Sequence, residues 1–307
     1  MNKEPVELTE GERSPGREKK VSEPREVKTL LAAKPAVEGA GVHLKRAFGF
    51  QEVPLFDPFL MLDDFRSANP ADYVQGFPSH PHRGIETITY VMAGEIEHLD
   101  SLGNHGRILP GDVQWMTAGS GIVHQEMPRG DDEGRMEGFQ LWANLPAERK
   151  MVAPRYRDIQ AMDIPEVVRD NGTRIKVLCG EVDGVHGPVH DVVIDPGYLD
   201  ISMPAHAEFK LPVRSDDTVF AYIFAGEACF CQKHGTRAAD GMVALLGDGE
   251  QVFITTAGMA CRFLLISGRP LGEPVAWQGP VVMNSQEELD LAFREVREGT
   301  FVKHQQT

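Results

Sequence analysis

Two pairs of metal-binding residue types, each with a spacing of two, stand out in the first half of the sequence. His80 and His82 form the first pair, and His124 and Glu126 form the second, after a glycine-rich bend. Residues i and i+2 of a β-strand point to the same face, so each pair can address one point from its own strand. Three imidazoles and one carboxylate make a site for a first-row transition metal. We therefore predict that the chain holds one such ion through His80, His82, His124 and Glu126.

The surroundings of these pairs favour an open metal site over a closed structural one. Structural zinc prefers four ligands rich in cysteine, and no cysteine lies near either pair in the sequence. Three histidines and a carboxylate leave positions for oxygen donors. Glu126 has two candidate roles, as an anionic ligand or as a general base on a bound hydroxyl group. Arg83 either supports the ligands or lies exposed.

The other histidines have no partner of a ligand type at such spacing. We interpret them as surface residues or as hydrogen-bonded core residues. They are His43, His98, His105, His186, His190, His206, His234 and His304. His98 stays a candidate for the pocket, because its strand follows the turn after the first ligand strand and could line the same cavity.

The elements that must position the two pairs are predicted to be short strands. The segment 86–92 is β-branched and aromatic, and turns at 93–95, 103–104 and 119–121 divide the chain after it. Strands that recur roughly every 8–12 residues are typical of a β-sandwich or barrel. The two aspartates that end the apolar run 56–65 are interpreted as turn or salt-bridge residues.

The second half of the chain contains turn motifs similar to those of the first half. The sequence FAGE at 224–227 echoes MAGE at 92–95, and LGDG at 246–249 echoes LPGD at 109–112. These echoes predict a degenerate internal duplication. The second copy lacks paired ligands, since His206 has no histidine two residues away, and we expect that copy to be metal-free.

The two ends of the chain differ in character from the body. Residues 1–26 mix both charges with Pro and Gly and are expected to be a disordered tail. Near the other end, Ser285 and Glu288 predict a capping box, an apolar stripe follows, and Gly299 can end the helix. This amphipathic helix is expected to dock onto the body.

Composition and charge exclude several classes of function. The net charge is -15, without a basic block past the first residues, which disfavours direct binding to nucleic acid. No apolar run is long enough to span a bilayer, and no secretory signal is apparent, so we expect a cytoplasmic protein. The four cysteines are interpreted as small buried residues in a reduced compartment, with a second metal site or redox pair at Cys229 and Cys231 as the alternative.

Several longer stretches of this sequence resemble the pirin family of the cupin superfamily. The stretches are FDPFLMLDDF, GFPSHPHRGIETITYVMAGEIEHLDSLGN, LPGDVQWMTAGSGIVHQEMP, FQLWANLP and the closing GPVVMN with its helix. The likeness covers about 27–301 and implies an all-β fold of two tandem cupin (jelly-roll-like) barrels with a C-terminal helix. The implied organisation is a tail at 1–26, a metal-binding barrel at 27–158, a metal-free barrel at 159–284, and a helix and tail at 285–307.

The resemblance also implies a cofactor and two functions. The ligands carry over onto His80, His82, His124 and Glu126, with iron(II) as the usual metal, although such ligands also accept manganese, nickel or copper. Some members resemble quercetin 2,3-dioxygenases, in which a flavonol binds through its 3-hydroxyl group, dioxygen adds, the ring opens and carbon monoxide leaves.

In that scheme Glu126 ligates the metal and can take the hydroxyl proton, and the family's pocket residues correspond to Phe77, Pro78 and Gln140. His98 is added to the pocket only because of the expected place of its strand. The alternative function is a non-catalytic, iron-dependent regulator that binds a transcription factor or a metabolic enzyme. We expect a monomer in either case.

Overall fold

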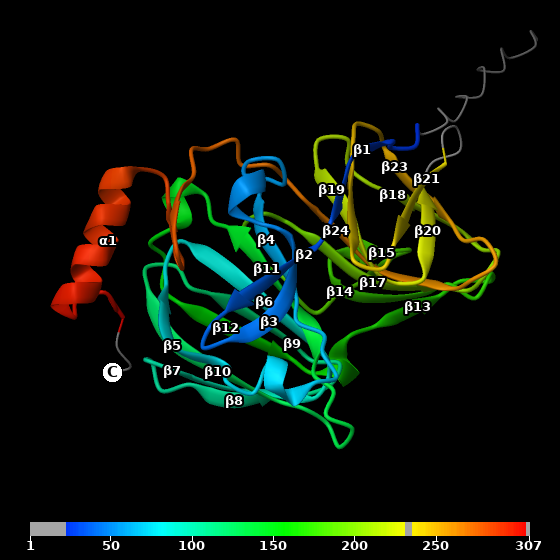
Figure 1. Cartoon of the computed structure of the whole chain (residues 1–307). Helices are drawn as coiled ribbons and strands as arrows, with labels where there is room; N and C mark the ends of the chain where they lie inside the picture. Colours follow the sequence, from blue (N-terminus) through cyan, green and yellow to red (C-terminus); the bar gives the residue numbers. More distant parts are fainter. Residues whose placement is uncertain (1–22, 231–234, 305–307) are drawn as a thin grey trace, which may run out of the picture.

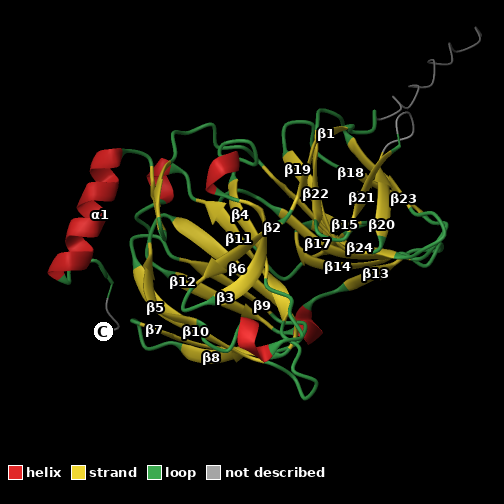
Figure 2. Cartoon of the chain, in the orientation of Figure 1, coloured by secondary structure: helices red, strands yellow, loops and turns green. Residues whose placement is uncertain are grey.

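The computed structural model describes residues 23–230 and 235–304, which form two β-barrels and one C-terminal helix (Figure 1). Strands dominate both barrels, and α1 stands apart at the edge of the first (Figure 2). This is the all-β fold with a C-terminal helix that the sequence predicts. No helix among the described residues is both long and apolar enough to cross a membrane.

The first barrel consists of a seven-stranded and a four-stranded antiparallel sheet. Its strands are β2 (Lys34–Glu38), β3 (Val42–Phe48), β4 (Phe59–Asp64), β5 (Phe77–His82), β6 (Ile85–Ala93), β7 (Glu95–Asp100), β8 (His105–Ile108), β9 (Val113–Thr117), β10 (Ile122–Arg129), β11 (Glu137–Asn144) and β12 (Arg155–Ile159). The sheet orders are β12-β9-β6-β11-β4-β3-β2 and β5-β10-β7-β8.

The second barrel repeats this arrangement strand for strand. Its strands are β1 (Val27–Ala32), β13 (Glu166–Val168), β14 (Arg174–Cys179), β17 (Gly197–Met203), β18 (Glu208–Pro212), β19 (Thr218–Ala225), β20 (Glu227–Phe230), β21 (Thr236–Ala239), β22 (Met242–Leu246), β23 (Gln251–Thr255) and β24 (Cys261–Gly268). The orders are β1-β22-β19-β24-β17-β14-β13 and β18-β23-β20-β21. A small hairpin of β15 (Glu181–Val182) and β16 (Val185–His186) lies outside these sheets.

The sheet orders support the predicted duplication. Of the two pairs of similar motifs in the sequence, however, only one pair occupies equivalent places in the two barrels. The turns at 93–95 and 225–227 lead into corresponding strands, β7 and β20. In contrast, LPGD at 109–112 precedes β9, whereas LGDG at 246–249 follows β22, the counterpart of β9. Gly and Asp suit tight turns wherever they occur, so such a motif does not by itself fix a register.

The seven-stranded sheets of the two barrels pack against each other through one aromatic core. Phe220 of β19 meets the rings of Phe48, Phe56 and Phe59 edge-on, with centroids 5.2–5.5 Å apart. Such edge-to-face pairs add to the area that the rings bury. Buried hydrophobic residues of both barrels therefore form one continuous core.

Two tyrosine–aspartate bonds cross this core in reciprocal directions. Tyr90 in the first barrel donates to Asp200 in the second over 2.8 Å, and Tyr222 in the second donates to Asp64 in the first over 2.7 Å. Each aspartate also pairs with an arginine of its own barrel, Arg262 or Arg66. Asp63 likewise pairs with an arginine, so salt bridges are confirmed for both aspartates that end β4.

The N-terminal residues belong to the second barrel rather than to the first. β1 pairs with β22, and this pairing covers what would otherwise be an exposed edge of the second seven-stranded sheet. Arg25, expected in the tail, is buried and donates to the carbonyl oxygens of Gly247 and Gly249. Residues 1–22 of the expected tail lie outside the described part of the chain.

The last segment of the chain returns to the first barrel. Residues 275–304, which we call the C-terminal arm, contain β25 (Ala276–Gln278), β26 (Val281–Met283) and α1 (Gln286–Glu298). The predicted capping box of Ser285 and Glu288 is confirmed, and Gly299 ends α1 in the left-handed conformation. The arm begins within the range expected for the second barrel, yet Val281 bridges to Arg83 of the first.

The cysteines give no sign of a redox pair in the described part of the chain. Cys179, Cys229 and Cys261 are free thiols, and burial raises the pKa of Cys179 and Cys261 to about 12. Thiols with a pKa this high are chemically inert at neutral pH. The alternative prediction, a metal site or redox pair at Cys229 and Cys231, depends on Cys231, which lies outside the described ranges.

Candidate metal centre

The structure brings together the three histidines that the sequence singles out. β5 and β10 are antiparallel neighbours, and His80 lies directly opposite His124 in their ladder. His82 shares the face of His80 because the two are separated by one residue. One nitrogen of each ring lies within 4.8 Å of the others, and no other group of three such side chains is this close among the described residues.

The distances between the three rings fit a single first-row metal ion. Nε2 of His80 lies 3.0 Å from Nε2 of His82 and 3.1 Å from Nε2 of His124. Two nitrogen ligands about 2.1 Å from a metal and at right angles to each other stand roughly 3 Å apart. Both distances therefore suit two neighbouring nitrogen ligands of one ion, with His80 shared between them.

Backbone carbonyls fix the ring orientation at two of these histidines. Nδ1 of His80 donates to Pro78 O over 2.8 Å, and Nδ1 of His82 donates to Pro280 O over 3.1 Å. Since a carbonyl can only accept, the proton sits on Nδ1, and in the neutral ring Nε2 offers its lone pair. A hydrogen bond on the far nitrogen is the usual support of a metal-bound histidine.

Burial keeps two of the rings neutral. Desolvation lowers the pKa of His82 and His124 well below the ordinary value, and the neighbouring imidazoles lower it further. Without a cation, the converging lone pairs would repel one another. Neutral nitrogens that converge at such short distances are the donor set that a transition metal requires.

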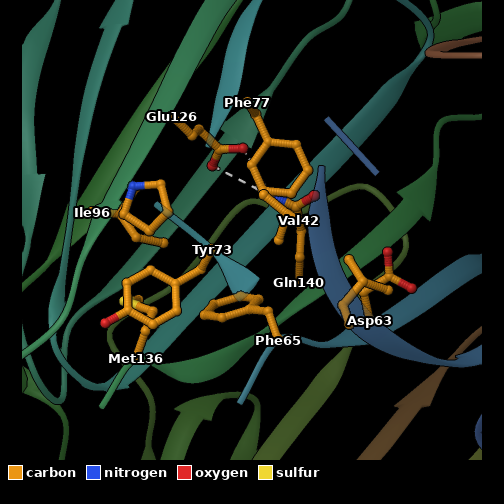
Figure 3. A pocket seen from close by; sticks show the side chains of 11 residues that line it. Val42, Asp63, Phe65, Tyr73, Phe77, Ile96, Glu126, Met136 and Gln140 are labelled. Carbon is orange, nitrogen blue, oxygen red and sulfur yellow. Dashed lines mark hydrogen bonds between the residues drawn. The ribbon is translucent and has the colours of Figure 1, made fainter. Parts of the chain in front are cut away.

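Glu126 lies beside the three rings but is held by other residues. Its carboxylate is buried and accepts hydrogen bonds from Gln140 Nε2 at 3.2 and 3.3 Å and from Thr89 Oγ1 at 3.4 Å. Figure 3 shows the bond between Glu126 and Gln140, with Phe77 next to them. Glu126 is not within the group of converging nitrogens. The carboxylate is therefore held by Gln140 and Thr89 and is not one of the converging donors.

A pocket of about 720 Å³ opens onto His80, His82 and Glu126. Its volume lies in the range of small-molecule sites. An aromatic series runs along its wall: His82 to Trp142 at 5.0 Å, Trp142 to Trp277 at 5.9 Å, and Trp277 to Phe50 at 5.6 Å between centroids. This wall suits a flat aromatic ligand.

Of the four residues predicted for the pocket, Phe77, Pro78 and Gln140 line it. His98, the fourth, does not line this pocket. Its strand, β7, lies one strand further from β5, and its ring stacks on Tyr156 at 5.6 Å. His98 faces a separate cleft of about 440 Å³.

A second, much smaller cavity, shown in Figure 3, is also lined by Glu126 and Gln140. It has room for about 20 Å³, and its remaining lining is largely apolar, with Phe65, Tyr73 and Met136 among the side chains. Glu126 and Gln140 thus contribute to both cavities.

Sequence reasoning missed the residues that the C-terminal arm brings to the site. Trp277 and Pro280 lie almost 200 positions after His82 in the sequence, and no spacing rule links them. Phe50 and Arg46 were also missed, because nothing in the sequence links the turn at 50–52 or strand β3 to the histidine pairs. Arg83, left open between support and exposure, is 1% exposed and hydrogen-bonded.

Comparisons with known proteins agree with this geometry. The family model described as Pirin matches residues 41–143, and the model described as Pirin C-terminal cupin domain matches residues 198–302. A pirin-like protein from Caulobacter vibrioides is 44% identical over 278 residues, covering 90% of this chain and 99% of its own length. A pirin-like protein from Solanum lycopersicum is 40% identical over 279 residues, covering 91% of this chain and 93% of its own length.

Among solved structures, a quercetin 2,3-dioxygenase from Acinetobacter baumannii superimposes with a TM-score of 0.84. It is 30% identical, and the match covers 91% of this chain and 99% of that one. The family models span both barrels, and the fold, like the three-histidine group, points to a cupin metalloenzyme. With its two cupin barrels and converging imidazoles in the first, this chain belongs to the pirin family.

Proposed function

We propose that this protein is a metal-dependent dioxygenase that cleaves flavonols such as quercetin, with iron(II) held by His80, His82 and His124. The observation that carries the proposal is the convergence of three Nε2 atoms at an aromatic-walled pocket of about 720 Å³. A closed metal sensor would need no such pocket. The similarity to a quercetin 2,3-dioxygenase supports the substrate class.

Each residue at the pocket has a distinct role in this reaction. A bound metal would supply a Lewis acid for the substrate's hydroxyl oxygen and a place for dioxygen chemistry. Glu126 accepts the hydroxyl proton, and Gln140 holds the carboxylate by donating to both of its oxygens. Trp142 and Trp277 stack against the flat substrate and exclude water from its reacting ring.

The direct test is turnover of quercetin by iron-loaded protein under oxygen, followed by loss of flavonol absorbance and release of carbon monoxide. The wild type should turn over, and His80→Ala should not. The matched control is His105→Gln, an exposed histidine on β8 of the same barrel, which should keep full activity. Equal activity in wild type and a metal-depleted His80→Ala variant would refute the proposal.

The role of Glu126 is tested separately with Glu126→Gln. This change preserves the shape of the side chain and removes its basicity. We expect metal content to stay the same while kcat falls by about 10²–10⁴-fold, the range for a lost general base. A parallel loss of metal would instead show that Glu126 is mainly a ligand.

A further inference from the structure

The C-terminal arm supplies a contact to a candidate metal ligand from outside the first barrel. The hydrogen bond that orients His82 ends on Pro280 O, in the turn between β25 and β26. Trp277, on the same hairpin, forms part of the pocket wall. The first barrel alone therefore lacks both the acceptor for His82 and one side of the pocket.

Arg83 joins the arm to the barrel immediately after His82. This arginine is 1% exposed, and its Nε donates to Ser120 O over 2.7 Å. Its Nη2 donates to Phe301 O over 2.8 Å and pairs with Glu295 at 2.7 Å, and its guanidinium lies 4.2 Å from the Phe301 ring centroid. One buried side chain thus holds both the helix of the arm and the segment that follows it.

The backbone around Gly84 also contacts the C-terminal arm. Val282 N–H donates to Arg83 O over 3.1 Å, and Lys150 Nζ donates to the carbonyl oxygens of both Gly84 and Val282 over 2.9 Å. Gly84 has a φ of +79°, and a Cβ there would lie 1.9 Å from Val282 O. The approach of the arm therefore requires glycine two positions after His82.

We propose that the C-terminal arm is a positioning element of the metal centre. Through Pro280 O it fixes the tautomer and direction of His82, and through Arg83 its docking is coupled to the strand that carries His80 and His82. Outer contacts of this kind typically change metal affinity by about 10- to 100-fold. Because coupling is reciprocal, metal binding must then strengthen arm docking by the same factor.

This inference rests on the metal-binding part of the proposed function, and hydrogen exchange of the wild type tests it without any substitution. Cobalt(II) is added to metal-free protein, and the exchange of the Val282 amide, which bonds to Arg83, is compared with and without metal. We expect cobalt to slow this exchange about 10-fold or more. If cobalt binds but leaves the arm amides unchanged, the inference is wrong, and if no cobalt binds, the proposed function itself fails.

A pair of variants gives a second measurement. Phe301→Ala removes the ring over Arg83 and should weaken cobalt binding by about 10-fold and change the visible absorption of the bound ion. Leu291→Ala alters an exposed residue of the same arm and should do neither. Wild-type affinity and spectrum in folded Phe301→Ala would overturn the inference, and if that variant does not fold, the exchange experiment still decides.

Discussion

The turn at 93–95 leads into β7 in the first barrel, and the matching turn at 225–227 leads into β20 in the second. Each of these strands begins with a glutamate, and the third residue after it is His98 in β7 and Phe230 in β20. His98 lies opposite Glu126 of β10, and Phe230 lies opposite Ile254 of β23. The register thus makes Ile254 the counterpart of Glu126.

The same register identifies counterparts for two of the histidines. Val252 lies two residues before Ile254 and matches His124, and Leu211, which faces Val252, matches His80. All three counterparts are buried in the apolar core of the second barrel. A barrel of this design therefore packs well with aliphatic side chains at the ligand positions.

This difference shows that the imidazoles are not needed for the fold. Burying polar rings costs free energy that aliphatic side chains do not, and their lowered pKa values reflect that cost. Since the second barrel forms without them, the histidines of the first are best explained by metal binding.

The largest effect is expected when a proposed metal ligand is replaced by its counterpart from the second barrel. His124→Val gives the first barrel the residue of the second, and we expect metal affinity to fall by more than about 100-fold, beyond the range for an outer contact. Metal analysis after dialysis measures the change. A variant that keeps one equivalent of metal would contradict the assigned site.

The reverse exchange should damage the fold of the second barrel. Ile254→Glu buries a carboxylate in an apolar core without a partner, and we expect a loss of about 3–5 kcal/mol in the free energy of unfolding. Glu126→Ile should cost far less, because it introduces an aliphatic residue that this position tolerates in the second barrel. Urea denaturation compares the two, and similar losses would argue against the register equivalence.

Removing either of the two tyrosine–aspartate hydrogen bonds between the barrels should lower the free energy of unfolding by a similar amount. Tyr90→Phe and Tyr222→Phe each remove one hydrogen bond to a buried aspartate that keeps its arginine. Each should cost about 1.5–3 kcal/mol, the range for a bond to a charged group. If thermal unfolding showed a loss in only one variant, the two bonds would not be energetically equivalent.

The smallest effect concerns pH in the metal-free protein. The pKa of His82 and His124 is lower in the folded state than in the unfolded state, so the unfolded state binds more protons below about pH 6.5. The free energy of unfolding should fall with decreasing pH there, by at most about 1.4 kcal/mol per pH unit for each histidine. His124→Val should flatten this slope in urea denaturation at pH 7.5 and 5.5, and an unchanged slope would contradict the assignment.

Much of this organisation was predictable because the signals are local. The i, i+2 pairs predict which rings share a face, and Ser285, Glu288 and Gly299 predict where α1 begins and ends. The MAGE and FAGE echo indicates the duplication, since both turns lead into corresponding strands.

The parts that could not be predicted depend on contacts between distant segments. The pairing of β1 with β22 and the bond from His82 to Pro280 join residues about 200 positions apart, and no periodicity encodes them. His98 lines a different cavity from Phe77, Pro78 and Gln140, because alternation gives the face of a strand but not its distance from the mouth of the barrel.

The most direct test of the central claim is anomalous diffraction at the iron edge from crystals of the iron-loaded protein. We expect one peak per chain, among Nε2 of His80, His82 and His124, and no peak in the second barrel. A peak in the second barrel, or none at the three histidines in protein shown to contain iron, would contradict this account.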